Sequence, residues 1–156
     1  MKTLTAALNL ISLFASSCTT NDLPVIPGGA SMVVVHGTSF GECAGYCRTE
    51  LTVRALSATF RRTTWRIDPP LPAKETTATL RADEWYAIVN SIDLVQLSRL
   101  DTIIGCPDCA DGGAEWVEVT DHGYHKKVMF EFGKSLPYIQ AMIDRLRAVE
   151  ARFQSF

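Results

Sequence analysis

The N-terminal segment limits the fold more than any other feature of the sequence, because it sets which residues fold and in which compartment. Lys2 is followed by an apolar stretch over residues 4–14 and then by three small residues before Cys18. One positive charge, a short apolar stretch and a small-residue stop are the layout of a secretory signal peptide. We therefore expect residues 1–17 to be removed on export.

Cys18 and the residues before it resemble the lipobox of bacterial lipoproteins, whose cysteine becomes the lipid-carrying first residue. A leucine would be more typical at Ala15, so ordinary signal-peptidase cleavage stays open. The chain has five cysteines, and an exported protein with an odd number has one assigned to another task. We predict a membrane anchor at Cys18 and a polar tether over residues 18–30. Because threonine, not aspartate, follows the cysteine, the resemblance implies the outer membrane, facing the periplasm, in a cell that has one.

The rest of the chain has the size and composition of one folded domain. Of the 156 residues, 47% are hydrophobic and 21% are charged, which excludes a disordered chain. About 140 residues remain after cleavage, enough for one domain and too few for two. The net charge of −2 gives no general attraction for nucleic acid, so we expect no such partner. We expect residues 31–156 to form a single domain.

Hydrophobic periodicity predicts an α+β domain. The expected strands are 32–36, 50–55, 59–67, 115–120 and 125–132, and the expected helices are 85–92 and 136–153. Pro137 is expected in the first turn of the second helix, and residues 93–101 are ambiguous between a helix tail and an irregular connection. The order βββ-α-ββ-α, with short connections, predicts an antiparallel sheet of about five strands with two helices packed on one face.

Four further cysteines form two clusters, Cys43 with Cys47 and Cys106 with Cys109. In an oxidising compartment we expect disulfides, and four cysteines allow three connectivities, among which the sequence does not choose. Two alternatives stay open: a zinc site of four thiolates, and thiol–disulfide chemistry, because Cys-Pro-x-Cys is a thioredoxin-like redox motif. Since turn residues and no helix follow the second cluster, we favour structural disulfides and expect neither metal nor other cofactor.

No residue pattern in the sequence indicates catalysis. The three histidines, His36, His122 and His125, lie in no nucleophile context such as G-x-S-x-G. Each is interpreted as a surface or capping residue, and we predict no catalytic residue.

The two cysteine-bearing loops, 37–47 and 105–114, are the expected binding region. A disulfide in either loop would stiffen its backbone, and rigid loops on a sheet commonly carry binding residues. We expect the loops to lie together at one end of the sheet. The expected contact surface consists of Phe40, Glu42, Tyr46, Asp108, Asp111 and Glu115.

Two motifs give the chain a resemblance to a group of exported bacterial lipoprotein-type domains of unknown function. They are Phe-Gly-Glu-Cys-Ala-Gly-Tyr-Cys at 40–47 and Gly-Cys-Pro-Asp-Cys-Ala-Asp-Gly-Gly-Ala-Glu-Trp at 105–116. Some members open with Cys-Phe-Gly-x-Cys-Pro-x-Tyr, where Ser39 and Ala44 stand here in place of the first cysteine and the proline. The resemblance implies no activity. We expect a lipid-anchored, disulfide-stabilised module that binds an envelope partner; the alternative is an exported thiol–disulfide or zinc-dependent enzyme.

Overall fold

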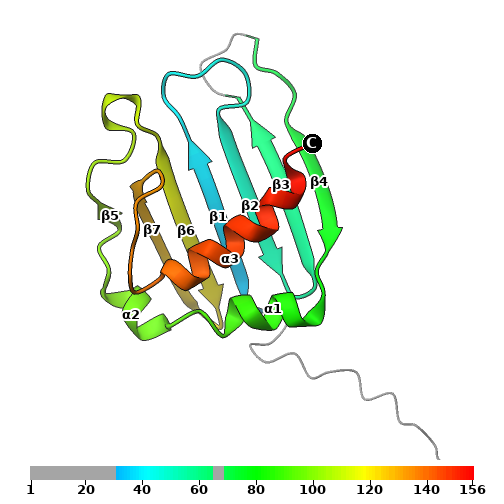
Figure 1. The fold of residues 1–156 in the computed structure, drawn as a ribbon, viewed down its shortest axis with the longest axis vertical. Coiled ribbons are helices and arrows are strands. Elements are labelled where there is room, and N and C mark those ends of the chain that lie inside the picture. The colour runs from blue at the N-terminus through cyan, green and yellow to red at the C-terminus, as the bar shows by residue number, and fades with distance from the viewer. Residues whose placement is uncertain (1–30, 65–68) are drawn as a thin grey trace, which may run out of the picture.

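The computed structural model describes residues 31–64 and 69–156. The expected signal peptide and tether lie outside these residues, as do the last residues of the third expected strand. The described chain is an α+β structure with one seven-stranded sheet of order β4-β3-β2-β1-β6-β7-β5 (Figure 1). The strands are β1 (Val33–Ser39), β2 (Arg48–Arg54), β3 (Ser57–Thr63), β4 (Lys74–Thr79), β5 (Ile103–Ile104), β6 (Ala114–Asp121) and β7 (Tyr124–Glu131).

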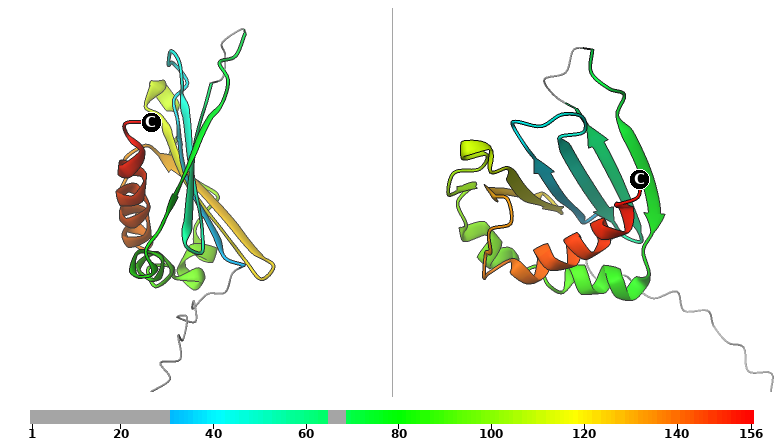
Figure 2. Two further views of the ribbon diagram at one scale, coloured as in Figure 1. Left: turned by 90° about the vertical axis from the view of Figure 1, so that its right-hand side faces the viewer. Right: turned by 45° about the horizontal axis from the view of Figure 1, so that its top comes forward.

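Helices cover one face of this sheet. They are α1 (Ala82–Val89), α2 (Leu94–Arg99) and α3 (Gln140–Glu150), with short 3₁₀ turns η1 (Cys109–Asp111) and η2 (Ala151–Phe153). The carboxylate of Asp93 starts α2 by accepting hydrogen bonds from the main-chain N–H groups of Val95 and Gln96. Figures 1 and 2 show α1 and α3 on the same face, with α3 crossing the strands obliquely. No helix within the described residues is long and apolar enough to cross a membrane.

The core lies between the helices and the face of the sheet that they cover. The strands contribute alternate residues, because successive side chains of a strand point to opposite faces. Its buried residues include Leu51, Phe60, Val117, Val128 and Phe130 from the sheet, Trp85 and Ile88 from α1, and Met142, Ile143 and Leu146 from α3. This alternation fixes which residues of each strand face α3.

Trp116 is buried although it points to the face that α1 and α3 leave open. Its indole lies directly over Gly37, its register partner on β1, where any Cβ atom would overlap the ring. The cations of Arg48 and Lys127 cover the ring, 4.5 and 5.0 Å from its centroid. The glycine at position 37 is therefore required by packing across the β1–β6 pair.

The α+β class, the five expected strands and the two expected helices are present, but the expected sheet is wrong in detail. The unexpected strands are β4 and β5, and the parallel pairing of β5 with β7 makes the sheet mixed. The residues left ambiguous at 93–101 form a third helix, α2. Pro137 precedes α3 instead of lying in its first turn, because that helix begins only at Gln140.

Candidate functional site

The two cysteine-bearing loops meet at one end of the sheet, as the sequence predicts (Figure 1). The main-chain N–H of Gly41 donates a hydrogen bond of 3.0 Å to the carboxylate of Asp108. The ring of Phe40 meets the ring of Phe132 edge to face, with 4.9 Å between centroids. Residues far apart in the sequence thus form one continuous region.

Each cysteine pairs within its own cluster. The Cα atoms of Cys43 and Cys47 are 5.6 Å apart, and those of Cys106 and Cys109 are 5.5 Å apart. Each bridge closes a short loop within its own cluster. The two loops are therefore joined by the hydrogen bond from Gly41 to Asp108 and not by a disulfide. The four sulfurs do not gather as a zinc site would require, and no other metal-holding group of three or more His, Cys, Asp or Glu occurs in the described part of the chain.

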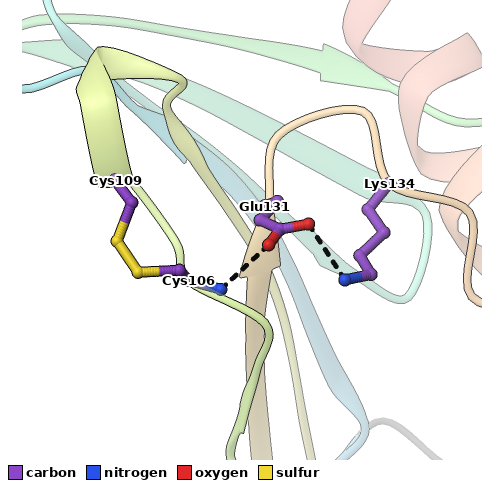
Figure 3. The surroundings of a disulfide bond; sticks show 4 residues. All are labelled: Cys106, Cys109, Glu131 and Lys134. Carbon is purple, nitrogen blue, oxygen red and sulfur yellow. Dashed lines mark hydrogen bonds and ion pairs between the residues drawn. A yellow bond between two sulfur atoms is a disulfide. The ribbon is translucent and has the colours of Figure 1, made fainter.

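The surroundings of the second disulfide differ from those of a thioredoxin-like motif (Figure 3). The main-chain N–H of Cys106 donates to the carboxylate of Glu131 at 2.9 Å, and Lys134 pairs with the same carboxylate at 2.9 Å. The turn η1 has only three residues and a left-handed Ala110, so it offers no helix N-terminus to stabilise a thiolate. A structural role for this bridge fits these contacts.

The other residues of the expected contact surface differ in exposure: two are exposed, Tyr46 is partly buried and Glu115 is buried. Glu42 and Asp111 are exposed, one in each loop. The hydroxyl of Tyr46 donates to the main-chain oxygen of Pro72 at 2.9 Å. Glu115, by contrast, is completely buried, so its placement on an exposed contact surface is wrong. The reason is the phase of β6, which points Glu115 toward the helices together with Val117.

A row of polar residues crosses the helix-covered face near the loops. Thr38 of β1 is the register partner of both Thr49 of β2 and Glu115 of β6, and Thr49 is the register partner of Arg62 of β3. The hydroxyls of Thr38 and Thr49 are 2.7 Å apart. The apolar inner face of the sheet therefore ends in a polar row at this end of the strands.

Glu115 lies at the centre of a group of charged side chains, which we name the His36 cluster: His36, Glu115, Arg147 and Glu150. His36 places Nε2 2.7 Å from Glu115 Oε1 and Nδ1 2.7 Å from Glu150 Oε2. Arg147 donates through Nε and Nη2 to the two oxygens of Glu115, at 3.0 and 2.6 Å. The main-chain N–H of Gly133 donates to Glu115 Oε2 at 3.0 Å. The cluster connects α3 to β1 and β6.

The geometry of the cluster favours an imidazolium at His36. Both ring nitrogens face carboxylate oxygens, which accept hydrogen bonds, so both nitrogens donate. Burial opposes this charge, but the hydrogen bonds to Glu115 and Glu150 outweigh it and raise the pKa of His36 above 6.5. Burial likewise opposes ionisation of Glu115, but hydrogen bonds from His36, Arg147 and Gly133 lower its pKa from 4.5 to about 2. The cluster thus contains balanced charges.

The His36 cluster and the polar row form the floor of a pocket of about 310 Å³. The pocket opens beside the end of α3, where Ala151 and Gln154 line it. Its other lining residues include the aromatic rings of Phe40, Phe60 and Phe132. A pocket that combines apolar walls with a few fixed polar groups is the usual form of a small-molecule site.

The sequence interpretation missed most of this site. His36 was expected at the surface or as a capping residue, but only 1% of it is exposed, because it occupies an inward position of β1. Arg147 and Glu150 were not recognised as candidates. The one available signal was Glu115, a carboxylate in phase with Val117 on the buried face of its strand. A buried carboxylate requires a partner, and this strand supplies none.

No protein-family model matches this chain, and no curated protein is significantly similar to it. The resemblance to exported lipoprotein-type domains therefore stays a prediction. No activity is inherited from a relative.

Proposed function

We propose that this chain is an exported binding module of the cell envelope, anchored through Cys18, with its ligand site in the pocket above the His36 cluster. The observation that carries the proposal is a charged cluster lining an open pocket, in which His36 and Glu115 are buried and Arg147 and Glu150 are partly exposed. Burying ion pairs costs desolvation energy, and apolar replacements are often equally stable. Charged groups with perturbed pKa values in a cleft are accordingly candidates for functional sites.

Binding fits the cluster better than catalysis does. A general base needs a free lone pair at its working pH, but both nitrogens of His36 are bonded to carboxylates. The hydroxyl of Thr49 donates to Glu150 Oε1 at 3.1 Å. Glu150 Oε2 also lies 2.7 Å from Nδ1 of His36, so both oxygens of this carboxylate are already engaged. The cluster therefore supplies a fixed polar surface and no activated nucleophile.

A plugging variant tests the ligand site. Ala151 is exposed and lines the pocket, so Ala151→Trp places an indole where a ligand would lie. Ala148→Trp is the matched control, because Ala148 is an exposed alanine of α3 outside the pocket lining. Both variants are made in the chain without the expected signal peptide, residues 18–156, carrying Cys18→Ala, so that neither a lipid nor the apolar segment 4–14 requires detergent.

The measurement is two-dimensional amide NMR during titration with a mixture of small aromatic and aliphatic fragments. We expect shifts at Thr38, Phe40 and Phe132 in the parent chain and in the Ala148→Trp control, and their loss in Ala151→Trp. Binding that persists in the plugged variant, or fragments that shift no pocket residue, would place the ligand site elsewhere and overturn the proposal.

The anchor is tested separately by fractionating cells that express the wild type or Cys18→Ala, with mass spectrometry of the N-terminus. We expect a membrane-bound wild type with a lipid on Cys18 and a soluble variant. An unmodified, soluble wild type would contradict anchoring.

A further inference from the structure

The charged side chains of the pocket lining are already engaged within the protein. In the His36 cluster the two cations face the two carboxylates, and every carboxylate oxygen receives a hydrogen bond. The remaining cation of the lining, Arg62, donates through Nη1 to an oxygen of Phe156 at 2.6 Å, and its Nε is buried. A charged ligand that gave up its hydration here would gain no free partner of opposite charge in the described lining, which costs free energy. The pairing therefore favours a neutral occupant.

One hydroxyl of the lining has hydrogen-bonding capacity that the protein leaves unused. Thr49 Oγ1 lies 2.7 Å from Thr38 Oγ1 and 3.1 Å from Glu150 Oε1. A hydroxyl carries one hydrogen and two lone pairs, and a carboxylate has no hydrogen to donate. Both contacts therefore contain a hydrogen only if Thr38 donates to Thr49 and Thr49 donates to Glu150. In this arrangement the lone pairs of Thr38 Oγ1 receive no hydrogen bond from the described residues.

This unused acceptor belongs to the pocket. Thr38 is only 9% exposed, and it lines the pocket beside Thr49. Leaving a buried acceptor without a donor costs free energy, so a ligand N–H or O–H group that reaches Thr38 Oγ1 gains a hydrogen bond that the protein does not make for itself. The polar part of the ligand is therefore a donor.

The walls set the rest of the ligand. The rings of Phe40 and Phe132 meet edge to face, and they line the pocket together with Phe60. Aromatic walls supply a large apolar contact area. The volume of about 310 Å³ is at the lower end of the range for small-molecule sites. The ligand is accordingly small, with an apolar body.

Resting on the proposed binding function, we propose that the pocket binds a small neutral compound that has an aromatic or branched apolar body and one hydrogen-bond donor, such as an alcohol or a phenol. The donor of the ligand bonds to Thr38 Oγ1, and the apolar body lies between Phe40, Phe60 and Phe132. The hydroxyl of Thr38 thus sets the orientation of the ligand, and the rings contribute most of the contact area.

Four probes that share one aromatic ring test this inference: benzyl alcohol, benzyl methyl ether, benzylammonium and benzoate. The ether replaces the hydroxyl hydrogen of the alcohol with a methyl group, so it can accept but not donate. Each probe is titrated into residues 18–156 carrying Cys18→Ala and followed by amide NMR. We expect benzyl alcohol to bind roughly fivefold more tightly than the ether, as one net hydrogen bond gives. Both charged probes should bind more weakly than the alcohol.

Three variants locate the acceptor. Thr38→Val keeps the shape of the side chain without its oxygen, so it should abolish the preference for alcohol over ether and leave binding of the ether unchanged. Thr38→Ser keeps the hydroxyl and should keep the preference. Thr52→Val is the matched control, because Thr52 lies between the inward-facing Leu51 and Val53 of β2 and points to the open face. It should change neither affinity.

The outcomes separate this inference from the proposed function. Equal affinity for alcohol and ether, tighter binding of a charged probe, or a preference that survives Thr38→Val overturns the neutral donor ligand. Failure of all four probes while other fragments shift pocket residues overturns it in the same way and leaves the pocket as a binding site. The four-probe comparison in the parent chain depends on no variant at Thr38. If binding of any probe persists in Ala151→Trp, the pocket itself is excluded and both proposals fail.

Discussion

Glu115→Gln tests the energetic role of the His36 cluster. The substitution removes the negative charge at nearly constant size, and the neutral amide resembles a protonated glutamic acid. Glu115 is completely buried, and its pKa lies at about 2 instead of 4.5. Since one pKa unit corresponds to about 1.4 kcal/mol, the folded state favours the carboxylate by about 3 kcal/mol. Breaking a buried ion pair by removing one partner costs a similar amount. We expect the variant to lose about 3 kcal/mol of unfolding free energy at pH 7.

The pH dependence of this loss has a definite sign. The pKa of Glu115 is lower in the folded than in the unfolded chain, so its contribution is fully present above pH 4.5. It is lost as the pH falls toward about 2, where the folded carboxylate also becomes protonated. The difference between wild type and variant should therefore be largest at neutral pH and should fall to roughly half at pH 3.

Urea unfolding of the disulfide-intact chain, followed by tryptophan fluorescence, measures this difference, because Trp85 and Trp116 are buried in the folded state. Glu118→Gln is the control: Glu118 lies on the same strand, and its contacts with His125 and Lys127, at 2.8 and 3.7 Å, are partly exposed. Such pairs contribute about 1 kcal/mol or less. A loss below about 1 kcal/mol for Glu115→Gln, or one equal to the control, would refute the stabilising role of the cluster.

Two further predictions concern His36 and the second disulfide. Because the pKa of His36 is raised above 6.5, its contribution to stability is complete below that pH and is lost as the pH rises through the folded value. NMR titration of the imidazole ring should give a pKa above 6.5, and a normal or lowered value would contradict the two hydrogen bonds. Replacing both Cys106 and Cys109 by serine should lower the unfolding free energy by about 2 kcal/mol, as expected for a loop of about four residues. The wild type should show no disulfide reductase activity in an insulin-reduction assay, since rapid turnover would favour the enzymatic alternative.

The elements of the fold that were predicted from sequence are those in which the order of apolar and polar residues follows which positions are buried. In β2, and in β6 over residues 117–120, the alternation of apolar and polar residues reflects one buried and one open face, and α3 repeats its apolar residues at helical spacing. The edge strand β4, by contrast, reads Lys-Glu-Thr-Thr-Ala-Thr and places no residue among the fully buried core. It is defined by main-chain pairing with β3, which no hydrophobic pattern reveals. β5 has only two residues, which are too few for a periodic pattern to predict a strand.

The His36 cluster was not predicted because its members are brought together only by strand register and helix placement. His36 and Glu150 are separated by 114 positions, and each alone resembles an ordinary surface residue. The register that aligns β1 with β6 is non-local, since β2 to β5 lie between them in the chain. No local pattern therefore indicates that His36 and Glu115 are near neighbours.

Register also explains why the pocket forms at the loop end of the sheet. Along the inward-facing positions, four adjacent strands change from apolar to polar residues toward the same end. The inward-facing residues that align with Val34 across these strands are apolar, and those that align with Thr38 are polar or charged. That polar row consists of Arg62, Thr49, Thr38 and Glu115. Apolar packing between sheet and helix cannot continue over such a row, because each buried polar group needs a hydrogen-bonding partner. Arg147 and Glu150 of α3 supply partners for part of it, and the remainder, with Arg62 at its edge, faces the pocket. The sequence of each strand thus sets where its own apolar inward-facing residues end. Strand pairing then aligns the polar residues that follow, and together they form one site.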